Sequence, residues 1–193
     1  MIAPAFRLPM CFDPVRLAAD LALAEPADWI PHFNTNDYEG DWTVLALRSI
    51  GGFVRRIGPA LNDPMPYADT PHMARFPYFR EIAAGFQMEQ RTVRLMKLAP
   101  GAEIRPHMDG YLGYEDGLVR FHIPVQTNPQ VEFMLDGRRL DMAPGETWYA
   151  DFNLMHSVAN RGETDRVHLV IDGVVNPWVT ALFETALGKT VGG

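Results

Sequence analysis

Two closely spaced pairs of residues in this 193-residue chain are of types that hold metal ions or anions. His107 and Asp109 are separated by one residue, and so are Arg120 and His122. In a β-strand, residues two positions apart point to the same face, so His107 and Asp109 would project together. One metal ion could bridge them. The alternative is a polar pair on the protein surface.

A metal site needs a further ligand, and His156 is the best candidate. It follows the segment WYADFNLM and begins a strand-like segment that could lie beside the first. Two histidines and one carboxylate on one face of a metal form a facial triad with open coordination positions. This arrangement is typical of non-haem Fe(II) sites. We therefore predict His107, Asp109 and His156 as metal ligands and catalytic residues.

Arg166 opens the apolar segment RVHLVIDGVV, where a cation is costly unless it has an anionic partner. A dicarboxylate that chelates the metal at one end would supply this partner, because guanidinium binds carboxylate through two parallel hydrogen bonds. The alternative is a surface charge at the end of a strand, paired with Asp165 or Glu163. His168 shares a face with Arg166 and is most simply a core histidine.

Other polar residues lie on strand-like segments near these positions. Arg120 and His122 share a face, and we expect them to point inward, near bound carboxylates; the alternative for His122 is a structural histidine. Arg94 and Arg105 are speculative anchors for a substrate carboxylate, and surface salt bridges are the simpler interpretation. His32 and His72 have no role that the sequence indicates.

The elements that would position these residues follow residue 90, where short strand-like segments alternate with turn motifs such as APGA, APGE and NRGETD. This spacing indicates an antiparallel sandwich or barrel. We expect a mainly β fold, a double-stranded β-helix (jelly roll, cupin-like) with flanking α-helices. The predicted helices cover 13–25, 76–86 and 176–187, and 42–50 is predicted as a buried strand.

We expect a single domain over 1–193. It would comprise an N-terminal part of helices and loops (1–90), a jelly-roll core (91–175) and the C-terminal helix (176–187). The long proline-containing loop 55–75 is predicted to cover the site and contribute to specificity, because loops of this length are often functional.

The composition places limits on function. Hydrophobic residues make up 47% of the chain and charged residues 21%, as in ordinary globular proteins. A net charge of -7 argues against nucleic-acid and anionic-membrane partners. The single cysteine, Cys11, cannot form an internal disulfide, and no apolar run is long enough to cross a membrane. These features predict a soluble, cytoplasmic protein, with its oligomeric state left open.

Residues 91–178 resemble the aspartyl/asparaginyl β-hydroxylase family of Fe(II)- and 2-oxoglutarate-dependent oxygenases. The resemblance is carried by the segments LAPGAEIRPHMD, VRFHIPVQTNP, PGETWYADFNLMHSVANRG and RVHLVIDGV. The earlier segments GDWTVLALRS and YADTPHMARFPYFREI also resemble the family, so the similarity covers most of the chain. It implies iron ligation by His107 and His156, an anchor for the distal carboxylate of 2-oxoglutarate at Arg166, and contacts from Arg120 and His122 to the bound carboxylates.

Two positions depart from the pattern of some family members. Asp109 supplies an acidic ligand that certain members lack, which favours hydroxylation over halogenation. Met96 stands where some members have a serine that helps hold the cosubstrate, which would make the pocket wall more apolar.

The resemblance implies hydroxylation of an amino acid, free or within a peptide, or of a related small carboxylate, with Fe(II), 2-oxoglutarate and O2. Small bacterial-type relatives include hydroxylases of free proline. Two alternatives stay open: a cupin-like metal enzyme that does not use 2-oxoglutarate, and a non-catalytic jelly-roll binding module.

Overall fold

A large antiparallel sheet forms one side of the protein in this computed structural model, which describes residues 2–58 and 63–188. In spatial order its strands are β1 (Ala5–Cys11), β11 (Glu146–Ala150), β8 (Leu118–Gln126), β13 (Arg166–Val174), β6 (Gln90–Leu98), β4 (Trp42–Ile50) and β2 (Ile30–Pro31). Strand β5 (Tyr67–Asp69) pairs with β4 off this path. The central strands β8, β13 and β6 are almost entirely buried, as expected for strands covered on both faces.

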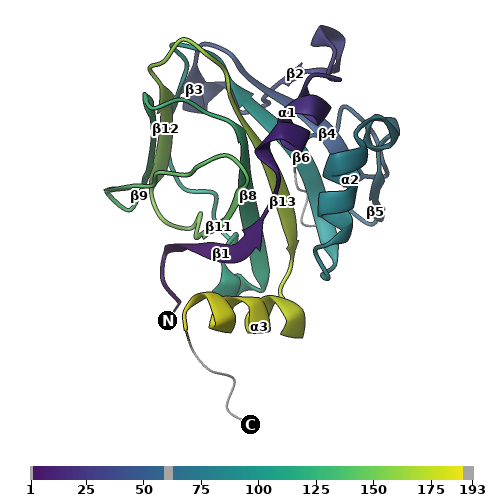
Figure 1. Ribbon diagram of the computed structural model, residues 1–193, viewed down its shortest axis with the longest axis vertical. Coiled ribbons are helices and arrows are strands. Elements are labelled where there is room, and N and C mark those ends of the chain that lie inside the picture. The colour runs from purple at the N-terminus through teal and green to yellow at the C-terminus, as the bar shows by residue number, and fades with distance from the viewer. Residues whose placement is uncertain (1, 59–62, 189–193) are drawn as a thin grey trace.

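A smaller antiparallel sheet faces the large one (Figure 1). Its strands, in spatial order, are β10 (Arg138–Arg139), β9 (Val131–Leu135), β12 (His156–Asn160), β7 (Glu103–His107) and β3 (Tyr38–Glu39). Short 3-10 helices lie in the connections: η1 (Pro26–Asp28), η2 (Thr35–Asp37), η3 (Pro71–Arg75) and η4 (Tyr114–Asp116). Two facing antiparallel sheets with this connectivity form a double-stranded β-helix, which confirms the predicted fold class.

Helices α1 (Pro14–Leu21), α2 (Pro77–Ala84) and α3 (Pro177–Ala186) lie outside the large sheet (Figure 1). Each begins with a proline at its first turn, where the missing N–H costs nothing. Asp13 caps α1 by accepting a hydrogen bond from the Val15 amide at 2.8 Å. Helix α1 ends at Leu21, earlier than the predicted end at residue 25.

Alternation along the strands separates two apolar cores. Phe121 and Ile123 on β8 point outward and pack with α-helical residues such as Phe79 and Phe183. The other face of the large sheet contacts the smaller sheet through a second core, which includes Met96, Val170, Ile104, Phe133 and Val158. The polar residues of β6, β8 and β13 that alternate with the first core therefore point into the space between the sheets.

Residues 1–90 contribute more strand than the sequence indicates. The segment Ala5–Cys11, for which no strand was predicted, forms β1 and pairs with β11, and β4 pairs with β6 in the centre of the large sheet. The alternation in AFRLPMC is weak because β1 lies at a sheet edge with one side partly exposed. The N-terminal part thus completes the sheet that the later strands begin.

Asp20 holds α1 against α2, and its replacement gives the first testable prediction. The buried Asp20 carboxylate accepts hydrogen bonds from the Tyr78 and Phe79 amides at 2.7 and 2.8 Å, and so caps the first turn of α2. We expect Asp20→Ala to lower the free energy of unfolding by about 1–2 kcal/mol in a urea titration. Asp20→Asn keeps an acceptor oxygen and should lose much less; an equal loss in both variants would contradict the capping role.

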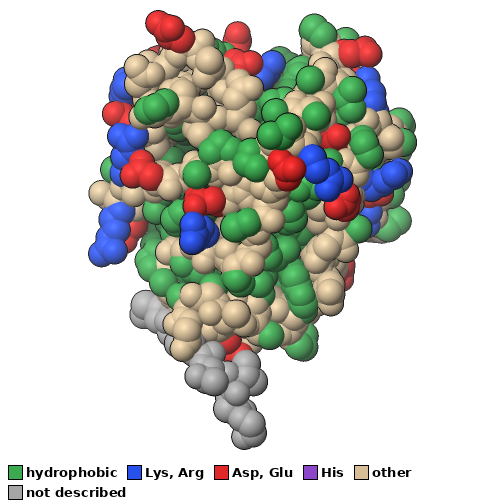
Figure 2. All heavy atoms as spheres, viewed as in Figure 1, with side chains coloured by type: hydrophobic (Ala, Val, Ile, Leu, Met, Phe, Trp, Pro, Cys, Tyr) green, Lys and Arg blue, Asp and Glu red, His purple; other side chains and the backbone are tan. Residues whose placement is uncertain are grey.

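Acidic and basic side chains are interspersed on the face that Figure 2 shows, with apolar side chains between them. This face therefore has no broad area of a single charge. Among the residues that the structure describes, no helix has the length and apolar character that a membrane crossing requires.

Candidate active site

The three predicted metal ligands come together at one end of the smaller sheet. His107 ends β7 and His156 begins β12, and these residues pair directly across the two strands, with ring centroids 4.2 Å apart. Asp109 follows β7 in a segment held by a 2.9 Å hydrogen bond from its own amide to the Phe152 carbonyl. One ligand atom from each residue lies within 4.8 Å of the other two. The group is therefore close enough to share one cation.

The hydrogen bonds of the two histidines orient both rings for metal binding. His107 Nδ1 lies 2.7 Å from the Arg105 carbonyl and His156 Nδ1 lies 3.0 Å from the Leu154 carbonyl. A carbonyl only accepts, so Nδ1 donates in each ring and Nε2 is the nitrogen that a metal would bind. His107 Nε2 faces Asp109 Oδ1 at 3.5 Å. Burial lowers the pKa of His156 to about 4, which keeps this ring neutral at physiological pH.

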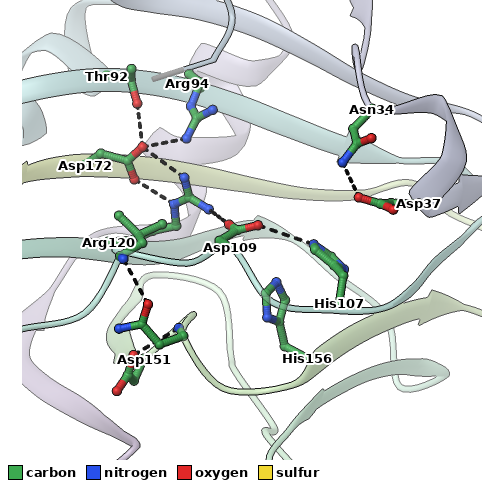
Figure 3. A network of polar contacts seen from close by, with 12 residues as sticks. Asn34, Asp37, Thr92, Arg94, His107, Asp109, Arg120, Asp151, His156 and Asp172 are labelled. Carbon is green, nitrogen blue, oxygen red and sulfur yellow. Dashed lines mark hydrogen bonds and ion pairs between the residues drawn. The ribbon is translucent and has the colours of Figure 1, made fainter. Parts of the chain in front are cut away.

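Asp109 is ionised and held from behind by Arg120. Burial opposes its ionisation, but the contacts with His107 and Arg120 outweigh burial and hold the pKa of this carboxyl below its usual range. Arg120 Nη1 donates to Asp109 Oδ2 at 2.5 Å (Figure 3). One carboxylate oxygen is therefore engaged by Arg120 while the other faces His107. This arrangement suits a ligand that offers one oxygen to a metal.

A second carboxylate, Asp172 on β13, fixes the guanidinium of Arg120. Arg120 donates from Nε to Asp172 Oδ1 at 2.7 Å and from Nη2 to Asp172 Oδ2 at 3.1 Å. The same carboxylate accepts from Thr92 at 2.8 Å and from Arg94 at 2.7 Å (Figure 3). Arg94 also donates to the Ile57 carbonyl at 2.8 Å. Two buried guanidinium groups thus neutralise two carboxylates in a connected network, as buried charges require.

Asp172 was not predicted as a site residue, although the sequence carries a signal for it. Asp172 is the one acid within the apolar segment RVHLVIDGVV and lies on the same strand face as Arg166 and His168. An acid at an inward position of a buried strand needs cationic partners. Arg94 and Arg120 on the flanking strands β6 and β8 provide them.

The network predicts that Asp172 positions the metal ligand Asp109 through Arg120. We expect Asp172→Asn to weaken metal binding by about 10–100-fold, because outer partners orient the ligands that bind the ion. It should also lower thermal stability, since two buried cations lose a counter-charge. Titration with Ni(II) and thermal unfolding measure the two effects. Asp141→Asn, which changes an exposed carboxylate paired with Arg139, should change neither; unchanged metal affinity in Asp172→Asn would contradict the positioning role.

Arg166 lies deep between the sheets and is 2% exposed. Within the described residues it forms no ion pair, so the alternative pairing with Asp165 or Glu163 is not found. Its Nη2 lies 2.9 Å from His168 Nδ1, and its Nε is buried without a hydrogen-bond partner. Burial lowers the pKa of Arg166 to about 9. A buried guanidinium with a free donor fits the carboxylate of an incoming ligand.

A cavity of about 340 Å³ joins the metal cluster to Arg166. Its wall includes the predicted ligands and the predicted inward residues Arg120 and His122. It also includes Arg94, for which the sequence favoured a surface salt bridge. Met96 also lines the cavity, so its wall is apolar at the position where some family members have a serine. The space is large enough for a small dicarboxylate and a small organic substrate.

Arg105 lies apart from this cavity. Its side chain is exposed at the surface, where it donates to Glu39 at 2.6 Å and to the Asn36 carbonyl at 2.8 Å. It is not among the residues that line the cavity. The strand loses its simple alternation here, because the register of β7 with β12 shifts after His156. The surface salt bridge is therefore what the structure shows for Arg105, whereas Arg94 faces inward.

His32, for which the sequence indicated no role, lines the same cavity as the metal cluster. Its ring stacks on Trp42 at 3.6 Å and on Phe33 at 4.5 Å. Burial lowers the pKa of His32 to about 3, so the ring is neutral. Its Nδ1 accepts a 3.3 Å hydrogen bond from the Asn34 amide, which leaves the proton on Nε2. No local pattern in PHFNTND indicates this placement, which depends on the pairing of β2 with β4.

A double-stranded β-helix with two histidines and one carboxylate at the mouth of an arginine-containing cavity defines a class of candidate metal-dependent oxygenases. A family model described as aspartyl/asparaginyl beta-hydroxylase matches residues 16–176. The chain therefore belongs to this family, as its motifs predicted.

Two curated relatives have related sequences. The chain is 30% identical over 164 residues to an L-proline cis-4-hydroxylase from Rhizobium meliloti (strain 1021), which covers 83% of this chain and 57% of the relative. It is 26% identical over 171 residues to L-proline cis-3-hydroxylase 2 from a Streptomyces species, which covers 83% of this chain and 56% of the relative. The chain thus spans little more than half the length of either relative.

Solved structures share the fold at low sequence identity. An oxidoreductase of the 2OG-Fe(II) oxygenase family from Burkholderia pseudomallei aligns with a TM-score of 0.59 and 18% identity, over 90% of this chain and 88% of that one. A prolyl-4-hydroxylase from Pseudomonas putida aligns with a TM-score of 0.55 and 12% identity, over 90% and 93%. At these identities the comparison supports the fold alone.

Proposed function

We propose that this protein is an Fe(II)- and 2-oxoglutarate-dependent dioxygenase that hydroxylates an amino acid, free or peptide-linked, or a related small carboxylate. The observation that carries the proposal is the buried Arg166, which has no counter-ion among the described residues and lines the same cavity as His107, Asp109 and His156. A cation site alone would fit many enzymes. Because Arg166 adds a positive charge at the other end of the cavity, the site favours a ligand with one anionic group for the metal and another for Arg166.

The residues present fit the two absent groups. His107, Asp109 and His156 would hold Fe(II) and leave coordination positions open, and Arg166 would hold the distal carboxylate of 2-oxoglutarate. When bound, the iron and the cosubstrate would supply the oxidising power for inserting oxygen from O2 into a C–H bond, with release of succinate and carbon dioxide. The chain itself would orient the ligands, exclude water and place the substrate carbon near the metal.

Several residues around the metal ligands and the cavity would support metal and substrate binding. Arg120 holds Asp109 in its ligating orientation and contributes positive charge near the bound carboxylates. Phe152 packs against His122 and His156 and keeps this part of the cavity apolar. Arg94 lines the cavity with one donor, Nε, that is buried without a partner, which suits a substrate carboxylate. The related proline hydroxylases agree with an amino-acid substrate of this size.

The segment 55–75, predicted as one long loop, contains strand β5 and the 3-10 helix η3, and its contribution to specificity stays a prediction. Its residues 59–62 lie outside the part that the structure describes. Ile57 is buried and its carbonyl accepts a hydrogen bond from Arg94, so this part of the loop contacts the wall of the cavity. Changes in this segment would therefore act on substrate binding through Arg94.

A mass-spectrometric screen tests the proposal. Free amino acids, beginning with L-proline, and short peptides would be incubated with the protein, Fe(II), 2-oxoglutarate and air. We expect a product that has gained one oxygen atom, formed only when both Fe(II) and 2-oxoglutarate are present. Aerobic turnover without 2-oxoglutarate would instead support a cupin-like metal enzyme, and failure to bind Fe(II) or Ni(II) would support a binding module.

A further inference from the structure

Three buried groups between the sheets, Arg166, His168 and His122, form a hydrogen-bonded chain that starts at the proposed carboxylate anchor. His168 Nδ1 lies 2.9 Å from Arg166 Nη2 and 3.2 Å from His122 Nδ1. His122, His168 and Arg166 are 5%, 2% and 2% exposed. These hydrogen bonds therefore connect Arg166, the predicted carboxylate anchor, to His122, which lines the same cavity.

The hydrogen-bond donors available on Arg166, His168 and His122 determine where the histidine protons lie. A guanidinium has only donors, so His168 Nδ1 must present a lone pair to Arg166. The same lone pair faces His122 Nδ1, and this second contact is a hydrogen bond only if His122 carries a proton on Nδ1. His122 Nε2 is then a bare acceptor. It is buried and has no hydrogen-bond partner within the described residues.

His122 lies between the two ends of the site. On β8, Arg120 pairs with Asp172 of β13, at the end of the site near the metal ligands. His122 pairs with Val170, the next inward residue of β13. Pro124 pairs with His168, which lies two residues from Arg166 on β13. Arg120 contacts the metal ligand Asp109. A dicarboxylate that spans the distance from the metal to Arg166 must therefore pass His122.

The groups around His122 disfavour its protonation in the ligand-free protein. Burial, and then the charges of Arg166, Arg120 and Arg94 together with His156, lower its pKa well below the usual range. Phe133 and Phe152 pack against the ring and offer it no charge or hydrogen bond. Without a ligand, the cavity thus has a positive potential around His122, and His122 Nε2 has a lone pair without a hydrogen-bond donor among the described residues.

A dianionic oxo acid would meet two mismatches here. Its carboxylate and keto oxygens are all acceptors, so none can donate to His122 Nε2. Its negative charge also weakens the positive potential that kept His122 neutral. Protonation of Nε2 would remove both mismatches, and it leaves the Nδ1 hydrogen bond to His168 intact.

We propose that His122 takes up one proton from solvent at Nε2 when the dicarboxylate cosubstrate binds, and that His168 prepares His122 for this by fixing its other proton on Nδ1. The inference rests on the proposed function. The solvent or buffer acid gives up this proton, an N–H bond forms at Nε2, and His122 then donates through it to the bound carboxylate; no other covalent bond changes. Because only the complex holds this proton, binding is tightest at low pH and weakens by about tenfold per pH unit between the pKa of His122 in the free protein and its higher value in the complex.

Calorimetry tests the proton uptake directly. 2-Oxoglutarate is titrated into the full chain loaded with Ni(II), at one pH near neutrality, in two buffers of different ionisation enthalpy. The buffer dependence of the heat gives the number of protons bound. We expect about one more proton per ligand in the wild type than in His122→Gln. We expect His72→Gln, which changes a histidine away from the cavity, to match the wild type.

Equal proton uptake in the wild type and His122→Gln would overturn the inference while leaving the proposed function standing. An absence of 2-oxoglutarate binding to the wild type would instead contradict the proposed function itself. A second measurement needs no variant: nitrogen NMR of the metal-free protein resolves its six histidines. We expect a neutral ring with its proton on Nδ1 for His122, and a proton on Nε2 would overturn the assignment.

Discussion

Replacing Arg166 with methionine is expected to weaken 2-oxoglutarate binding by about 100-fold or more. The guanidinium would form charge-assisted hydrogen bonds in a buried setting, where loss of one partner of a charge pair costs about 2–5 kcal/mol. Titration calorimetry on the Ni(II)-loaded protein measures the loss. Metal binding itself should be unchanged, because Arg166 makes no contact with His107, Asp109 or His156.

The same substitution should raise the stability of the ligand-free protein. Arg166 is buried without a counter-ion among the described residues, and a methionine of similar length removes this desolvated charge. The lost hydrogen bond to His168 costs about 1 kcal/mol and offsets part of the gain. Arg105→Met, at the surface, should change neither property. Unchanged 2-oxoglutarate affinity in Arg166→Met would contradict the anchor.

Replacing His107 with alanine is expected to remove Fe(II)-dependent turnover and to weaken Ni(II) binding by more than about 100-fold. Even partners one step behind a metal ligand change affinity by about 10–100-fold, so loss of a ligand should cost more. His107 is also paired directly with His156 across the strands, and in both rings Nδ1 is engaged by a backbone carbonyl, so Nε2 is the nitrogen that the ion would bind. Equilibrium dialysis with Ni(II) measures the metal affinity without requiring turnover.

A matched variant separates loss of a ligand from loss of a histidine. His72 lies beside Asp28, with 3.5 Å between His72 Nε2 and the carboxylate, and does not line the cavity. We expect His72→Ala to keep full metal affinity. If His107→Ala bound metal and released succinate as the wild type does, the assignment of the metal site would be wrong.

The strand pattern after residue 90 was sufficient to predict the double-stranded β-helix, and the family motifs were sufficient to predict the family. Alternation also placed Arg120 and His122 inward, because Phe121 and Ile123 on the opposite face of β8 are large and apolar. For Arg94 the sequence favoured a surface salt bridge, whereas the structure places it in the cavity wall. The spacing of His107 and Asp109 and the strand start at His156 predicted ligands that the structure brings together.

Other features depend on contacts between distant segments, which local patterns do not carry. Strand β1 was missed because an edge strand has only weak alternation. His32 enters the cavity through the pairing of β2 with β4 and through its stack on Trp42. Asp172 was recognisable as an acid in an apolar strand, but its partners Thr92, Arg94 and Arg120 come from two other strands.

Succinate release measured together with product formation tests the central claim most directly. The Fe(II)-loaded protein would be supplied with 2-oxoglutarate, air and the amino acid that the screen identifies. We predict succinate and oxygenated product in equal amounts, both abolished by omitting Fe(II) or 2-oxoglutarate and both lost in His107→Ala. Product formed without 2-oxoglutarate, or at an unchanged rate in His107→Ala, would contradict the account.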